Sequence, residues 1–119
     1  MKKIQLLTNN RIKLLTNSKS NQGYVYIITS DSYNNKLKIG RTKTRDNIGD
    51  IKKYLFRRFH TSLGQSINIY LFHSNNFIVD ENKIHFHLDD YREKSTELFR
   101  INLDKAIMVC KKITQSDCI

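Results

Sequence analysis

The sequence predicts one α+β domain, in which a small antiparallel sheet of three strands is flanked by helices. Two short runs of β-branched and aromatic residues, separated by turn-forming residues, indicate a β-hairpin. After the hairpin, apolar residues recur at helical spacing, then in strict alternation, then again at helical spacing. A length of 119 residues suits a single hydrophobic core, so we expect no second enzymatic domain.

The predicted hairpin joins residues 24–29 to residues 37–40 through the turn formers of residues 31–35. Its strands must pair antiparallel, which excludes a doubly wound nucleotide-binding fold. The third predicted strand lies at residues 67–72, because Ile or Leu occupies every second position at its start.

Three helices complete the predicted domain. The first covers about residues 46–60, with apolar residues at spacings of three, four and four: Ile48, Ile51, Leu55 and Phe59. The second begins near Asp80, which would cap it, and continues to Tyr91. The third covers about residues 103–113 and buries an apolar face: Leu103, Ala106, Ile107 and Cys110.

Positive charge is concentrated in the first half of the chain. Lys and Arg number 21 against 11 Asp and Glu, a net charge of +10, and residues 1–22 carry five positive and no negative side chains. This balance favours a polyanionic partner, nucleic acid before an anionic membrane surface. We expect a basic extension over residues 1–22, built as a hairpin or an irregular arm, and a folded domain over residues 23–119.

Cysteine spacing and hydropathy indicate in which cellular compartment the protein is expected. Cys110 and Cys118 do not have the paired spacing of a zinc ribbon or a secreted disulfide framework. No apolar run approaches the ~18 residues of a membrane span. We therefore expect a soluble intracellular protein, in the cytoplasm or nucleus of a host cell or in a virion, with an oligomeric state left open.

Four short motifs follow one another along the chain. They are Gly23-Tyr24-Val25-Tyr26-Ile27, Lys38-Ile39-Gly40-Arg41-Thr42, Glu81-Asn82-Lys83-Ile84-His85 and Thr96-Glu97-Leu98-Phe99. In this succession they resemble the GIY-YIG endonuclease superfamily, and most of all its small branch from phages and large DNA viruses, whose second motif commonly reads KIGRT. The resemblance covers about residues 23–100, and it implies a GIY-YIG-like fold.

The resemblance also implies an activity, the hydrolysis of DNA phosphodiester bonds with one divalent metal, Mg²⁺ or Mn²⁺. By position, Tyr26 would activate water and Glu81 would hold the metal. An arginine of the first helix would steady phosphate charge, and both Arg57 and Arg58 remain candidates. Lys38 stands where the superfamily has its second tyrosine. Without a separate DNA-reading domain, we expect low sequence specificity or a preference for DNA structure.

The residue types agree with this chemistry. Tyr24 and Tyr26 share a face of their strand, where Lys38 of the partner strand could favour a tyrosinate base; the alternative is that both rings edge the core. Glu81 and His85 share a helix face and could approach one metal–phosphate centre, or could support the helix start and a structural hydrogen bond. Glu97 could orient Lys38 or water, or form an ordinary salt bridge.

A basic set of side chains is predicted to contact DNA phosphates: Arg41, Lys43, Lys53, Arg57 and His60. The second functional hypothesis is a nucleic-acid-binding module on the same scaffold without catalysis. The presence of both Tyr26 and Glu81 favours the nuclease, and we expect no membrane partner and no small-molecule cofactor.

Overall fold

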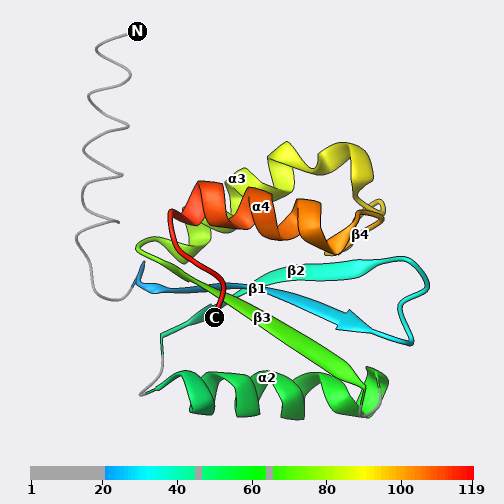
Figure 1. Cartoon of the computed structure of the whole chain (residues 1–119), viewed down its shortest axis with the longest axis horizontal. Coiled ribbons are helices and arrows are strands. Elements are labelled where there is room, and N and C mark those ends of the chain that lie inside the picture. The colour runs from blue at the N-terminus through cyan, green and yellow to red at the C-terminus, as the bar shows by residue number, and fades with distance from the viewer. Residues whose placement is uncertain (1–20, 45–46, 64–65) are drawn as a thin grey trace, which may run out of the picture.

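The computed structural model describes residues 21–44, 47–63 and 66–119. The strands are β1 (Gly23–Ser30), β2 (Leu37–Lys43), β3 (Ile67–Ser74) and β4 (Leu98–Phe99), and the helices are α2 (Ile48–Leu63), α3 (Phe77–His87) and α4 (Leu103–Thr114). The strands form one antiparallel sheet in the order β3-β1-β2-β4. One face of this sheet is covered by α2, and the other by α3 and α4 (Figure 1). Most of the predicted extension over residues 1–22 lies outside the described residues.

Strand β1 lies inside the sheet, between β2 and β3. Its first six residues are buried, because it pairs with β2 on one side and with β3 on the other. The predicted hairpin and third strand are confirmed, but the count of three strands is one too low. The fourth strand, β4, has only two residues, too few for any alternation to show in the sequence. At the far edge, the backbone N–H of Ile119 donates to Leu71 of β3 at 2.8 Å.

The two faces of the sheet bury two separate apolar clusters, because successive strand residues point to opposite faces. Toward α2 lie Tyr24, Tyr26, Ile28 and Leu71, which pack with Ile51 and Leu55 of the helix. Toward α3 and α4 lie Val25, Ile27, Ile39 and Phe72, which pack with Ile84, Ala106 and Cys110. The helices are therefore held by apolar burial against one shared sheet.

The start of α3 differs from the prediction. The helix begins at Phe77, and its N-cap is Asn76, whose side chain accepts from the backbone N–H of Val79 at 3.2 Å. Asp80 was wrongly predicted as the cap; it lies in the first turn and accepts from the Ser74 hydroxyl. The helix ends at His87, and Tyr91 belongs to a following 3₁₀ turn, Asp89–Tyr91. The predicted α2 and α4 are confirmed to within three residues at each end.

Gly40 makes room for the Tyr26 side chain. The two residues lie directly opposite each other in the β1–β2 register, and Tyr26 is only 1% exposed. A Cβ atom at position 40 would collide with the Tyr26 ring and its hydroxyl oxygen. Only glycine therefore lets the phenol lie flat across β2.

Replacing Gly40 with alanine should destabilise the fold by about 1–3 kcal/mol, because the buried ring and the neighbouring backbone would have to shift. Denaturant unfolding measures this, with Gly49→Ala as control, since a Cβ at Gly49 of α2 would meet only Asn47 Oδ1 at 3.1 Å. Adding Tyr26→Phe should recover part of the loss by removing the colliding hydroxyl. Equal effects of Gly40→Ala and Gly49→Ala would contradict this account.

Candidate active site

Tyr26 lies at the centre of the candidate site. Its ring is 6.0 Å from that of Phe59 in α2, and two cations flank Phe59: Lys38 Nζ lies 5.4 Å, and the Arg58 guanidinium 5.0 Å, from the Phe59 ring centre. Burial raises the pKa of Tyr26 above its usual value, the Glu97 carboxylate raises it further, and Arg58 acts in the opposite direction. The phenol therefore carries its proton at neutral pH.

Lys38 and Glu97 form an ion pair, with Lys38 Nζ 2.8 Å from Glu97 Oε1. Burial acts to raise the pKa of Glu97, but the hydrogen bond and charge of Lys38 outweigh it and the pKa is lowered. The ammonium of Lys38 is thus committed to a carboxylate. The structure gives no support to the expectation that Lys38 favours a tyrosinate, because the pKa of Tyr26 is raised.

Glu81 is a buried carboxyl group in α3, and Arg41 contacts only one of its two oxygens. Arg41 of β2 donates from Nη1 to Glu81 Oε1 at 3.1 Å. Within the described ranges, Glu81 Oε2 is buried and no donor group reaches it, and the side chain is only 6% exposed. The Glu97 carboxyl group lies close enough to share a hydrogen bond with Glu81 when one of the two is protonated. Burial, and after it the nearby Glu97, raises the pKa of Glu81 to about 7. A buried acceptor without a donor is costly, so such groups need a separate explanation.

His85 ties α3 to the sheet. Its Nε2 lies 2.9 Å from the carbonyl oxygen of Ile39, and its ring packs 5.1 Å from that of Phe99. Burial lowers the pKa of His85, so the ring is neutral and Nε2 carries the proton that it donates to Ile39. Nε2 lies 3.8 Å from Glu81 Oε2, beyond hydrogen-bond distance. This contact occupies Nε2 with a structural hydrogen bond, while Nδ1 keeps its lone pair, so the hydrogen bond to Ile39 is compatible with both alternatives for His85.

The structure brings together most of the predicted catalytic set. The charges of Glu97, Arg58 and Glu81 all act on Tyr26, and Arg41 contacts Glu81. Arg58 is therefore the arginine of α2 that lies near the phenol. Phe59 was missed as a site residue, although its position directly after Arg58 is the signal that could have identified it.

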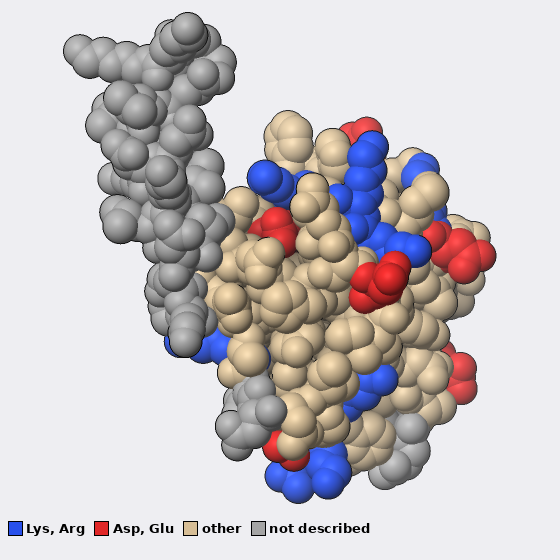
Figure 2. Space-filling view, turned by 60° about the vertical axis from the view of Figure 1, so that its left-hand side comes forward, with Lys and Arg blue, Asp and Glu red and all other residues tan. Residues whose placement is uncertain are grey.

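Other predicted residues contact different parts of the molecule. The Tyr24 ring packs edge-on against His73, with ring centres 5.5 Å apart. His60 stacks on Phe56, and its Nδ1 lies 3.1 Å from the carbonyl oxygens of Phe56 and Arg57. The predicted phosphate contacts Lys43 and Lys53 are exposed at the end of β2 and on α2. Figure 2 shows basic and acidic side chains interspersed on one face, so no unbroken basic patch covers that face.

The site fits a cation that takes few protein ligands. Among the residues that the structure describes, no group of three or more His, Cys, Asp or Glu side chains could enclose a metal. Within the described part of the chain, Glu81 Oε2 is nevertheless buried without a donor group, and the Glu97 carboxyl group lies beside it, so a cation could take the place of the proton that the two would share. Magnesium commonly binds through one or two carboxylates and completes its coordination with water and phosphate oxygens. The donor set therefore fits Mg²⁺ or Mn²⁺ with Glu81 as the ligand.

Comparisons with known proteins place the chain in a family. The family model described as "T5orf172 domain" matches residues 23–114. This is a phage-associated domain of nuclease-type fold, loosely associated with nuclease activity and nucleic-acid binding. No curated protein and no solved structure matches the chain. No helix within the described ranges has the length and hydropathy needed to cross a membrane.

The raised pKa of Glu81 predicts a loss of stability as the pH rises. Folding raises this pKa from 4.5 to about 7, so the folded state holds the proton more tightly than the unfolded state does. The resulting stabilisation is complete below about pH 4.5 and is lost as the pH rises through about 7. Between about pH 4 and pH 8, the unfolding free energy of Glu81→Gln should therefore rise relative to wild type by about 1–3 kcal/mol.

Denaturant titrations in metal-free buffer at several pH values measure this difference. Asp104→Asn, at an exposed position in the first turn of α4, controls for the removal of one negative charge. Wild type and Glu81→Gln with parallel stability curves would show that burial does not perturb this carboxyl.

Proposed function

The chain belongs to the T5orf172 domain family, and from that premise we propose that it is a divalent-metal-dependent DNA endonuclease of GIY-YIG type. It would hydrolyse phosphodiester bonds with low sequence specificity or with a preference for DNA structure. The motif order and the pairing of Tyr26 with Gly40 support the GIY-YIG assignment. Its chemistry would be hydrolysis by water, with magnesium or manganese as the ion.

The observation that carries the proposal is the buried Glu81 carboxyl group beside Glu97: among the described residues no donor group reaches its Oε2, and the two carboxyl groups hydrogen-bond only when they share a proton. Arg41 contacts only Oε1 of Glu81, so this ion pair does not offset the charge of two neighbouring carboxyl groups. Strongly perturbed carboxylates are enriched in functional sites, because binding and catalysis need charges in places where folding alone would not put them. A cation on Oε2 would explain both the burial and the missing donor.

Each residue of the site would have a defined part. Bound magnesium would polarise the phosphate and stabilise negative charge on the leaving oxygen. Glu81 would hold this ion. The Tyr26 phenol, which keeps its proton, would position the attacking water by hydrogen bonding. Arg58, beside the Phe59 ring, would neutralise charge that develops on the phosphate.

The Lys38–Glu97 ion pair would hold the Glu97 carboxylate in a fixed position beside Glu81. Glu97 stays ionised because its pKa is lowered, whereas the pKa of Glu81 is raised. In neighbouring carboxyl groups with opposite shifts, the group with the raised pKa holds a proton more readily and the other stays charged, and a bound cation would displace the proton from Glu81. In this proposal Glu97 accepts a hydrogen bond from the attacking water, and Lys38 keeps Glu97 in place. The water oxygen would bond to phosphorus as the bond to the leaving oxygen breaks, and the proton that the water loses would end on that leaving oxygen.

A second function, DNA binding without cleavage, has one specific observation in its favour. Arg41 and Lys38, two cations of the second motif, already pair with Glu81 and Glu97. These pairs neutralise the two carboxylates within the protein, as in a site where ion pairing has replaced metal binding. Cleavage assays therefore decide between the two functions.

The first assay is plasmid nicking with magnesium or manganese. Glu81→Gln preserves the shape of the side chain but removes the charge that holds the cation, so cleavage should fall by at least about 100-fold. DNA binding should persist or tighten, because repulsion of the phosphate is relieved. Asp104→Asn is the control and should nick like wild type. A wild-type protein that binds DNA but never nicks it with either ion would leave the binding module as the function.

The second assay distinguishes Arg58 from Arg57. At saturating protein, the single-turnover cleavage rate of Arg58→Ala should fall by about 10²- to 10³-fold, because a group that stabilises developing charge is lost. Arg57→Ala should instead lower affinity, so that added protein restores its rate. Arg100→Ala, at an exposed arginine before α4, controls for the loss of one positive charge. A defect of Arg57→Ala that persists at saturation would reassign the phosphate arginine.

A further inference from the structure

A groove of about 470 Å³ lies between α2 and β3, which we call the α2–β3 groove. Lys52, Lys53 and Arg57 of α2 line it with their positive charges. Phe56 of the same helix and two isoleucines of β3, Ile67 and Ile69, supply apolar lining. The groove thus combines cations with an apolar surface, and the candidate active site uses none of these side chains.

The three cations of the groove have no acidic partner within the described residues. The cations of β2 and its turn behave differently, because Lys36, Lys38 and Arg41 each pair with a glutamate. Three unneutralised charges on neighbouring turns of one helix repel each other, and a polyanion would relieve that repulsion. Phosphates spaced along a nucleic-acid backbone are such a polyanion.

The apolar lining indicates what kind of nucleic acid the groove would take. Phe56 is held in place by stacking on His60, with ring centres 5.3 Å apart and an angle of 1° between the planes. A duplex hides the faces of its bases and presents phosphates and groove edges, so it would leave this lining without a partner. An unpaired strand offers base faces for an aromatic ring together with phosphates for the cations. The lining therefore favours single-stranded DNA.

The groove shares its helix with the candidate active site. Arg58 and Phe59 of α2 lie at Tyr26, whereas Lys53 and Arg57 line the groove. An α-helix with its side chains is about 10–12 Å across, which is about three nucleotides at ~3.4 Å per step along a strand. One DNA strand could therefore contact both places.

From these observations we propose that the α2–β3 groove binds an unpaired DNA strand beside the scissile phosphate. The preferred substrate is then a duplex with a single-stranded segment, such as a flap or a branch. The position of the scissile phosphate rests on the proposed nuclease function, whereas strand binding by the groove does not.

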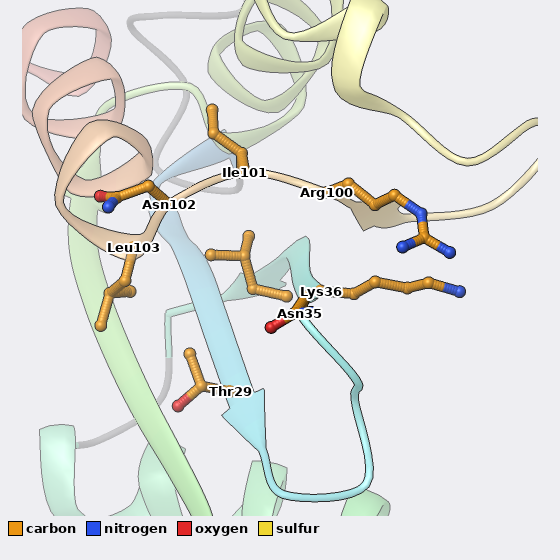
Figure 3. A pocket seen from close by; sticks show the side chains of 8 residues that line it. Thr29, Asn35, Lys36, Arg100, Ile101, Asn102 and Leu103 are labelled. Carbon is orange, nitrogen blue, oxygen red and sulfur yellow. The ribbon is translucent and has the colours of Figure 1, made fainter.

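A second hollow of similar volume, about 470 Å³, makes a weaker candidate for such a strand (Figure 3). Its lining includes Lys36 and Arg100, together with Asn35 and Asn102. Glu93 already neutralises Lys36, with Nζ 3.0 Å from Oε2. No aromatic side chain lines this hollow, so it lacks the stacking surface that Phe56 supplies in the α2–β3 groove.

The test measures binding in EDTA, where no cleavage occurs. Fluorescence anisotropy across a salt series compares a labelled oligothymidylate with a blunt duplex of equal length, using the full chain. The triple variant Lys52→Gln/Lys53→Gln/Arg57→Gln should lower the slope of log affinity against log salt by about 2 for the single strand. The matched triple variant Lys94→Gln/Lys112→Gln/Arg100→Gln removes the same charges at exposed positions elsewhere and should lower it by less than half as much.

A second variant tests the apolar lining. Phe56→Leu should weaken single-strand binding by about tenfold, because stacking with a base is lost, and should leave the salt slope and duplex binding unchanged. Arg57→Gln alone, at an exposed position, provides the charge test should the triple variant fold poorly, as checked by circular dichroism. Equal losses in the two triple variants, or unchanged single-strand binding by Phe56→Leu, would overturn the proposal.

A cleavage comparison separates this proposal from the nuclease itself. Wild type should nick a flapped duplex faster than a blunt one, and Phe56→Leu should lose that preference while still nicking the blunt duplex. A protein that binds single strands through the groove but cleaves nothing would uphold the groove and refute the nuclease. A protein that cleaves both substrates equally, in wild type and Phe56→Leu, would uphold the nuclease and refute the placement of the groove beside the scissile phosphate.

Discussion

The close approach of the Tyr26 ring to Gly40 fixes the register on which the rest of the structure depends. With Tyr26 opposite Gly40, Lys38 falls on the same face of β2 as the phenol, while Ile39 and Arg41 fall on the other face. The Ile39 carbonyl then receives His85, and Arg41 reaches Glu81. A slip of one residue would exchange the two faces and break each of these contacts. One glycine therefore positions α3 as well as the phenol.

The fold shifts the pKa values of three side chains in the candidate site. Burial raises the pKa of both Tyr26 and Glu81, and the ion pair with Lys38 lowers that of Glu97. The carboxyl groups of Glu81 and Glu97 lie close enough to influence each other, so the charge state of one depends on that of the other. A fold under selection for stability alone gains little from such an arrangement, whereas a site that moves protons gains a great deal.

Much of the fold could be predicted because its main elements have strong local signals. The β1–β2 hairpin, α2 and α4 each show several apolar residues at a regular period. The two-residue β4 has no period to read, and its pairing with β2 depends on the tertiary fold. The prediction of Asp80 as the N-cap was wrong because Asn76, a residue type that caps equally well, lies one turn earlier. The sequence does not show which of the two lies outside the helix.

The sequence pointed to candidate residues that the structure places near one another, but it did not show how they pair. Motif order gave Tyr26, Glu81 and Glu97 as candidates, yet no spacing could show that Lys38 would pair with Glu97 and Arg41 with Glu81. Which of Arg57 and Arg58 lies near the phenol depends on the rotation of α2 about its axis, since adjacent helix residues point about 100° apart. That rotation is set by the burial of Ile51 and Leu55 against the sheet.

Within the described part of the chain, α2 is the single helix on its face of the sheet (Figure 1). The candidate site is therefore mechanically divided: α2 carries Arg58 and Phe59, whereas the sheet, α3 and the chain before β4 carry Tyr26, Glu81 and Glu97. A tilt or partial undocking of α2 would separate the arginine from the phenol and leave the Arg41–Glu81 pair intact. Loss of the single interface between α2 and the sheet would therefore take apart one half of the candidate site, while the other half stays folded.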